Sequence, residues 1–245
     1  MTDRVPIKIR LDRYLSGAGL GSRSQVAALV RRGSVSVADA LVRDPAFRLV
    51  PGAWVSVNGA PVCWKPSYHR LLHKPGGTVT STVSSDGPSV LGCLPPDVQD
   101  RGWMPVGRLD LDTTGLLLLT TDGELAHRLT HPRWKVEKRY EVLLAQPVTT
   151  EDVETFAQGL SIEGERWLPA ELFREADSHR ATVTLREGRY HQVKRMFGSR
   201  GNTVLSLHRA AFGPLALTPD LARGASRELL PDEESALYAA VGLKT

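Results

Sequence analysis

The sequence predicts an α+β protein of two domains. A small basic N-terminal domain precedes a larger domain with a mixed, largely antiparallel sheet flanked by helices. The chain has 245 residues, enough for two modest domains. Residues 1–65 carry ten basic and four acidic side chains, a net charge of +6, which leaves −2 for the rest of a chain whose net charge is +4. Strand and helix patterns then alternate without a repeat, which favours an α+β fold.

The N-terminal region predicts two helices followed by short strands. Apolar spacing indicates a helix over residues 11–20, ended by glycine, and a second helix with Ser22 as its N-cap. Alternating residues indicate strands at residues 35–37 and 54–57, and Asn58-Gly59 is typical of a tight turn. The linker to the second domain is expected at residues 63–67, because Pro66 interrupts regular structure and the basic bias stops there.

We therefore place the domains at residues 1–66 and 67–245. In the second domain, residues 71–77 indicate a strand that runs into a turn, and the aliphatic run 116–119 indicates a buried strand. Further strands are expected at residues 139–144, 181–185 and 203–207, helices at residues 124–129, 151–160 and 192–197, and a turn at Asp122-Gly123.

Composition excludes several classes of protein. With 41% hydrophobic and 24% charged residues, the chain is close to the globular average. Its longest aliphatic run, residues 116–119, is far shorter than the roughly 20 residues of a membrane-spanning helix, and no apolar signal stretch follows Met1. We therefore expect a cytoplasmic protein that does not engage a membrane. Only Cys63 and Cys93 are present, so neither a disulfide framework nor a thiolate metal site is expected.

Basic residues gather on the predicted helix pair. Arg23, Arg31 and Arg32 on one helical hairpin would attract phosphate without reading bases, whereas solvated surface charge with no partner is the alternative. The stretches Arg-Leu-Asp-Arg-Tyr-Leu, Gly-Ser-Arg-Ser and Arg-Arg-Gly together resemble the S4-type (alpha-L) RNA-binding module over about residues 8–62. On that resemblance we expect RNA to be bound by Arg10, Arg13, Arg23, Arg31 and Arg32.

Three stretches concentrate reactive residues. In residues 107–115, Asp110 lies between two leucines, which favours partial desolvation in a loop. The alternative is that Asp110 and Asp112 are Asx-turn residues that bond their own backbone. Tyr140 could stack on a base, or could be a half-buried strand tyrosine. Polar residues from 186 onward are expected to begin the last helix, where Lys194 either joins the solvated face or turns toward a carboxylate.

The motif Gly-Arg-Leu-Asp-x-x-Thr-x-Gly-Leu and the stretches around Tyr140 and Lys194 closely resemble the pseudouridine synthases, in particular the RsuA subfamily that modifies small-subunit ribosomal RNA. The resemblance implies that Asp110 is the catalytic aspartate and Lys194 its basic partner. It further implies that Arg108 lies beside the flipped nucleotide, that Tyr140 lies against the uracil ring and that Leu185 packs on the other side of the base. Asp112 is not the catalytic position in that family.

The chemistry implied by this resemblance needs no cofactor. The reaction breaks the bond from uracil N1 to the ribose, rotates the base and rejoins it through C5, without redox change or group transfer. One carboxylate must attack the substrate or move a proton, and the sequence does not choose between these roles. Burial disfavours the charged form of a carboxylate, so a cation at Lys194 is expected to keep Asp110 ionised in a dry pocket.

Nearby histidines receive lesser roles. We expect His191 to support the site or the fold, because the reaction does not require a proton shuttle at neutral pH, and the role of Gln192 stays equally open. The spacing of His127 and His131 could suit a metal, but Pro132 ends that helix and no further ligand is near, so no metal site is expected. The family commonly has Asn before Lys-Pro, where this chain has His73.

The resemblance implies a monomer that isomerises a uridine in 16S ribosomal RNA, either free or within a partly assembled subunit. Two alternatives remain. Related synthases that share these motifs act on large-subunit (23S) ribosomal RNA, and the same scaffold could serve as a non-catalytic RNA-binding or assembly factor. The presence of Asp110, Tyr140 and Lys194 together argues against the second alternative, because a pure RNA binder has no need for an acid in a basic cleft.

Overall fold

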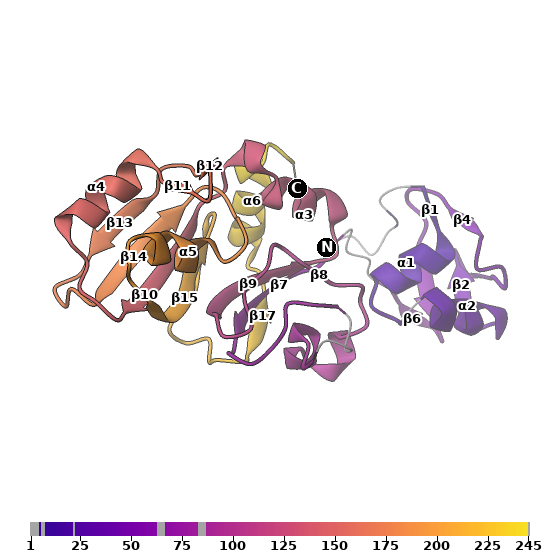
Figure 1. Cartoon of the computed structure of the whole chain (residues 1–245). Coiled ribbons are helices and arrows are strands. Elements are labelled where there is room, and N and C mark those ends of the chain that lie inside the picture. The colour runs from indigo at the N-terminus through magenta and orange to yellow at the C-terminus, as the bar shows by residue number, and fades with distance from the viewer. Residues whose placement is uncertain (1–4, 6–7, 22, 63–66, 83–86, 245) are drawn as a thin grey trace. The chain divides into compact units, whose positions relative to one another are not determined.

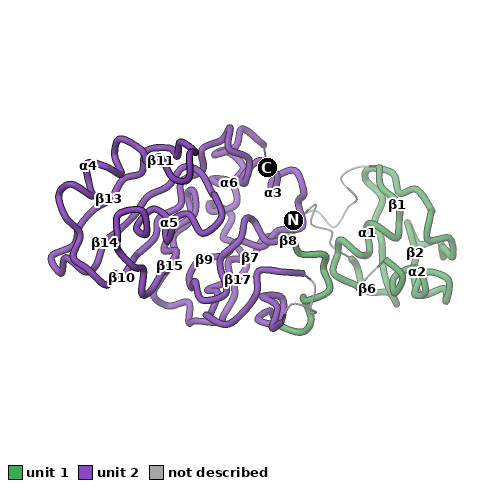
Figure 2. Tube along the Cα trace, viewed as in Figure 1, with its two compact units in different colours: residues 1–68, 95–103 green, residues 69–94, 104–245 purple. Residues whose placement is uncertain are grey.

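The computed structural model describes residues 5, 8–21, 23–62, 67–82 and 87–244. The chain forms two compact units, residues 1–68 with 95–103 and residues 69–94 with 104–245, shown in separate colours in Figure 2. The segment 95–103, which contains the short 3₁₀ helix η3 (Pro96–Val98), groups with the first unit, a feature that the sequence did not indicate. Ser22 and Pro66 lie outside the described residues, so the expected helix cap and the domain boundary stay predictions.

The first unit contains the expected helix pair and strands. Its elements are α1 (Leu11–Gly17), α2 (Arg23–Arg31), the paired strands β1 (Ile9–Arg10) and β4 (Arg48–Leu49), and a four-stranded sheet of β3 (Ala40–Leu41), β2 (Val35–Val37), β5 (Val55–Val57) and β6 (Ala60–Pro61). The turn between β5 and β6 is confirmed, because Asn58 and Gly59 both adopt positive φ, 50° and 80°. Tyr14 is fully buried and donates a hydrogen bond to the Val62 carbonyl at 2.8 Å.

The second unit is built on a mixed sheet. Its strands are β7 (His69–Lys74), β8 (Met104–Pro105), β9 (Thr114–Thr120), β10 (Lys138–Leu144), β13 (Glu171–Arg174), β14 (Arg180–Leu185), β15 (Val204–Phe212), β16 (Leu215–Ala216) and β17 (Ser226–Glu228). They follow the order β13-β14-β10-β15-β9-β7-β17, with β16 on β15 and β8 on β9 (Figure 1). Of the pairs described in this sheet, β15–β9 is parallel and the others are antiparallel. The predicted mixed, largely antiparallel sheet is therefore confirmed.

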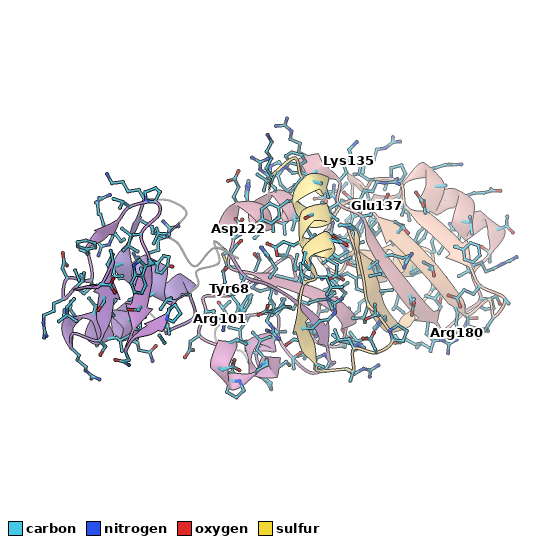
Figure 3. The ribbon with its side chains drawn as sticks, turned by 180° about the vertical axis from the view of Figure 1, so that it is seen from behind. Tyr68, Arg101, Asp122, Lys135, Glu137 and Arg180 are labelled. Carbon is cyan, nitrogen blue, oxygen red and sulfur yellow. The ribbon has the colours of Figure 1, made fainter. Side chains whose placement is uncertain are left out.

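Helices cover both faces of this sheet. They are α3 (Gly123–Thr130), α4 (Thr150–Gln158), α5 (Gln192–Ser199) and α6 (Pro231–Ala240), with the 3₁₀ helices η2 (Val90–Cys93) and η4 (Pro132–Trp134). Figure 1 shows α5 in front of β10, β14 and β15, whereas Figure 3, seen from behind, shows the yellow helix α6 in front of the sheet. Leu237 and Tyr238 of α6 join the core with Leu71 of β7 and Leu118 of β9. Burial of these apolar side chains stabilises the packing of α6 against the sheet.

Local details correct two predictions from the sequence and add two elements that it did not indicate. Asp122, labelled in Figure 3, is the N-cap of α3 and accepts hydrogen bonds from two backbone amides, so it begins a helix and is not only a turn residue. Residues 186–191 form a turn, and α5 begins at Gln192 after His191, whose φ is 49°. The C-terminal strand β17 and helix α6 were not expected. No described helix is long and apolar enough to cross a membrane.

Gly115 explains how the parallel pair forms. It lies on β9 opposite Arg209 of β15 and has a φ of 112°. A Cβ atom there would lie 2.3 Å from the Arg209 carbonyl oxygen, so any side chain would push the two strands apart. The glycine of the Thr-x-Gly-Leu motif is thus needed for backbone approach, next to the loop that carries Asp110.

Candidate active site

The loop between β8 and β9 carries Asp110 and is anchored on both sides. Leu109 is buried, and its backbone N–H and carbonyl both bond to the Thr80 hydroxyl, at 3.2 and 2.8 Å. The Thr113 amide donates to the Asp110 carbonyl at 3.1 Å, which closes a tight turn. The side chain of Asp110 remains 27% exposed. For Asp110 these bonds do not form an Asx turn, because its backbone carbonyl, not its carboxylate, accepts the bond from the Thr113 amide.

Lys74 holds the same loop through hydrogen bonds to its backbone carbonyls. It ends β7, its side chain is fully buried, and its ammonium donates to the carbonyls of Asp110, Leu111 and Thr113 at 3.1, 3.3 and 2.9 Å. Burial lowers the pKa of Lys74 to about 8, with the nearby charge of Asp112 acting in the opposite direction. The three carbonyl bonds fix the shape of the turn that presents Asp110.

Two basic side chains from the start of α5 face Asp110. Lys194 Nζ lies 3.6 Å from Asp110 Oδ2, and His191 Nε2 lies 3.5 Å from Asp110 Oδ1. The closest bonds of Lys194 go to Asp112, at 2.7 and 2.8 Å, and they lower the pKa of the Asp112 carboxyl. Lys194 is therefore shared between two carboxylates, and its bond to Asp112 was not indicated by the sequence.

A cavity of about 570 Å³ opens beside this loop. It is lined by four of the five residues expected to form the site, namely Arg108, Asp110, Tyr140 and Leu185. Tyr140 and Leu185 come from neighbouring strands and are 8% and 2% exposed. Lys194 is beside Asp110 but does not line this cavity, and instead borders a second hollow along α5. His191 lines both.

The cavity also contains two cations that were not expected from the sequence. Lys138 lies two residues before Tyr140 on β10, and Arg209 of β15 is directly opposite Tyr140 in the strand register. Burial and, to a smaller extent, the positive charge of Arg209 lower the pKa of Lys138 to about 8. Lys138 could have been predicted to face the cavity, because residues two apart on a strand share one face and Tyr140 was already assigned to the site. Arg209 could not, because no local sequence pattern predicts that an arginine is buried.

Other expected residues lie elsewhere. His73 bonds the Leu221 carbonyl at 2.8 Å and does not line the cavity. His131 ends α3 and accepts a bond from the Arg133 amide, and no group of three or more His, Cys, Asp or Glu among the described residues could hold a metal. Gln192 bonds Glu187 at 2.7 Å and the Arg189 amide at 3.0 Å, which orders the turn before α5.

The first unit presents the expected arginines on its surface. Arg10, Arg13, Arg23, Arg31 and Arg32 are all exposed. Arg10 pairs with Asp12 at 2.8 Å and Arg23 lies 3.8 Å from the same carboxylate, which also lowers the pKa of Asp12. Among the described residues, Arg13, Arg31 and Arg32 have no carboxylate partner within 4.0 Å. Their charge is available for an anionic ligand.

Comparisons with known proteins identify the families that both parts of the chain match. Residues 68–199 match the family described as RNA pseudouridylate synthase, and residues 9–55 match the S4 domain. The chain is 37% identical over 233 residues to Ribosomal small subunit pseudouridine synthase A of Vibrio cholerae, covering 94% of this chain and 100% of the relative. It is 40% identical over 230 residues to the protein of the same name from Escherichia coli K12, covering 92% and 98%. A crystal structure of a pseudouridylate synthase matches with a TM-score of 0.66 and 34% identity, over 94% of this chain and 99% of that one.

An S4 domain and an α+β unit with an aspartate loop beside a cavity define an enzyme that acts on RNA. The chain belongs to the RNA pseudouridine synthase family, and within it is similar to the RsuA proteins, which confirms the resemblance inferred from the motifs.

Proposed function

We propose that this pseudouridine synthase isomerises a uridine of small-subunit (16S) ribosomal RNA. The proposal is supported by the two relatives named for that subunit, which the chain covers over 98–100% of their length. Their name specifies the subunit but not the nucleotide. We further propose that the protein acts as a monomer in the cytoplasm, on ribosomal RNA that is free or held in a partly assembled subunit.

The observation that carries the proposed mechanism is the meeting of Arg108, Asp110, Tyr140 and Leu185 around one cavity. In this proposal Asp110 acts on the ribose as nucleophile or base, while Lys194, 3.6 Å away, favours its ionised form. His191 lies at a similar distance and keeps the supporting role expected from the sequence.

The remaining cavity residues would accept the everted base. Extraction of a stacked base from RNA costs a few kcal/mol, and stacking on an aromatic ring returns about 1–3 kcal/mol. Tyr140 is proposed to provide that ring and Leu185 the opposing apolar surface, since both are buried on adjacent strands. Arg108 at the cavity wall would fill the space that the base vacates in the RNA.

Replacement of the carboxylate tests the role of Asp110. Asp110→Asn keeps the shape of the side chain and the backbone bonds of the loop, so we expect pseudouridine formation to fall below detection. RNA affinity should stay within about threefold, because Asp110 makes no contribution to phosphate binding. Turnover is measured by release of tritium from [5-³H]uridine-labelled RNA. Retained turnover in Asp110→Asn would refute the proposed mechanism.

The substrate is tested by mapping pseudouridine in ribosomal RNA from cells with and without the protein. We expect one 16S position to lose its pseudouridine and to regain it when the wild-type protein, but not Asp110→Asn, is supplied. Loss of a 23S position would instead assign the large subunit. An unchanged map in both RNAs would favour a non-catalytic assembly role.

A further inference from the structure

Lys138 and Arg209 share one wall of the cavity and have no part in the mechanism above. Lys138 Nζ lies 5.7 Å and the Arg209 guanidinium carbon 5.2 Å from the centre of the Phe212 ring, so both cations flank one aromatic side chain. Tyr140 is next to both, since it follows Lys138 by two residues and pairs with Arg209 across the sheet. The two cations therefore border the place proposed for the base.

Neither cation is neutralised by a carboxylate. No described Asp or Glu lies within 4.0 Å of either side chain. The nearest acid that influences Lys138 is Glu187, and its oxygens are already occupied by the Leu168 amide, Gln192 and Arg189. Lys138 donates to the Val136 carbonyl at 2.9 Å and keeps two further N–H groups.

Arg209 is the stronger indication of a ligand. The residue is 1% exposed, and its Nε donates to the Leu116 carbonyl at 2.8 Å, yet its Nη2 is buried without a hydrogen-bond partner among the described residues. A buried charged donor without a partner costs several kcal/mol. The arrangement suits an electronegative atom that arrives with the substrate.

The depth at which Arg209 is buried favours a base over a phosphate group as its ligand. A phosphate group remains attached to the RNA backbone and cannot reach a side chain that is 1% exposed, whereas a flat base can enter edge first. In uracil, C4 lies across the ring from N1, which carries the ribose, so the carbonyl oxygen O4 reaches deepest. Uracil presents an acceptor there, whereas cytosine presents an amino donor.

We infer that Lys138 and Arg209 bind O4 of the everted uracil and thereby select uracil over cytosine. The inference rests on the proposed function, because it requires the base to occupy this cavity. When the bond from N1 to C1′ breaks, its electron pair stays on the ring and spreads onto O2 and O4, where the two cations stabilise it. C5 then bonds to C1′, the ring loses the C5 proton and N1 gains one, so atoms and charge balance.

The test combines a protein change with a substrate change. Sulfur accepts hydrogen bonds weakly, so RNA with 4-thiouridine at the target should lower kcat/KM of the wild-type enzyme by about tenfold relative to uridine RNA. Lys138→Met should lower kcat/KM on uridine RNA by about 10- to 100-fold and reduce the further effect of sulfur to less than about threefold, because only Arg209 then donates to that atom. Arg139→Met is the matched control on the same strand, since Arg139 is exposed and does not line the cavity.

A pH profile separates electrostatics from folding. Because the pKa of Lys138 is lowered to about 8, its ammonium loses a proton as pH rises through that value, and kcat of the wild type should fall. Lys138→Arg keeps the charge at high pH, so this variant should recover most of the activity lost in Lys138→Met and should show a smaller alkaline fall than the wild type. Any fall due to Lys74, whose pKa is also lowered to about 8, is common to all variants. The other charged groups bordering the cavity, which are common to all variants, are Arg108, Asp110, Glu187, Arg189, His191 and Arg209.

The outcomes are distinguishable. A sulfur effect in Lys138→Met equal to that of the wild type, or a wild type that converts both RNAs equally, would overturn the inference and leave the proposed function intact. A wild type that forms no pseudouridine in any ribosomal RNA would remove the proposed function itself. Thermal denaturation of Lys138→Met alongside Arg139→Met shows whether the fold is retained, and Lys138→Arg provides the test if it is not.

Discussion

The charge of Lys194 is divided between two carboxylates whose exposure to water differs. The side chain of Asp112 is 70% exposed, so water screens much of its attraction for the ammonium in spite of the 2.7 Å bond. Asp110 is 27% exposed, and bound RNA would shield it further. The longer contact, 3.6 Å, therefore has the greater effect on the proposed reaction, and the shorter one mainly positions the Lys194 side chain.

Substitutions of Lys194 and Asp112 should show separately what the contact of Lys194 with Asp110 and its contact with Asp112 contribute to the rate. Lys194→Met should lower kcat by about 100-fold, equivalent to about 2.7 kcal/mol, because Asp110 loses its nearest ammonium. Lys194→Arg should keep more activity, since the charge is retained. Asp112→Asn should lower kcat less than about fivefold. Single-turnover rates at saturating RNA measure all three, and a larger loss in Asp112→Asn than in Lys194→Met would contradict this assignment.

At the scale of elements, the site depends on strands that approach each other closely. The Asp110 loop runs into β9 just where β9 meets β15 in parallel, and Gly115 allows that approach. Lys74 at the end of β7 then fixes the loop through three carbonyls. The position of Asp110 is thus set by three neighbouring strands, and a change in strand spacing would reach the site without touching a proposed catalytic residue.

Gly115→Ala should therefore destabilise the fold. The new Cβ would lie 2.3 Å from the Arg209 carbonyl oxygen, in a backbone conformation with φ of 112° that alanine rarely adopts. We expect a loss of at least about 3 kcal/mol in the free energy of unfolding, or failure to fold. Gly198→Ala in α5 is the control, because a Cβ there meets nothing within 4 Å, and it should be neutral or stabilising by up to about 1 kcal/mol. Urea denaturation compares them, and equal stability of the two variants would refute the packing argument.

Elements with a clear pattern could be predicted from the sequence, and those shaped by tertiary contacts could not. The strand at residues 116–119 is fully buried, so its continuous leucines identified it. Helix α6 buries only Leu237 and Tyr238, which provides no apolar stripe to detect. Arg209 was missed because a charged residue is expected on the surface. The bond from Lys194 to Asp112 joins residues 82 positions apart, a distance over which local patterns carry no information.

At the scale of the whole molecule, the excess positive charge belongs to the N-terminal region. Residues 1–65 have ten basic and four acidic side chains, and one of the acids, Asp12, faces Arg10 and Arg23 and offsets their charge locally. Arg13, Arg31 and Arg32 keep exposed guanidinium groups. Phosphate binding by this unit should therefore depend most on those three, and less on the two arginines that share Asp12.

Salt dependence measures how many of these arginines bind phosphate. Removal of one arginine–phosphate pair should reduce the slope of log Kd against log salt concentration by about 0.7–0.9, so replacing Arg13, Arg31 and Arg32 by Gln should reduce it by about 2.1–2.7. Arg10→Gln and Arg23→Gln together should change it by less than about 1, because Asp12 already competes for them. Arg174→Gln, an exposed change in β13, should not alter the slope. Equilibrium binding to ribosomal RNA between about 50 and 200 mM salt gives these slopes. A triple variant with the wild-type slope would mean that other cations of the protein bind the phosphates. As a control, kcat at saturating RNA is expected to be the same in all of these proteins, because the substitutions change RNA binding and not the reaction.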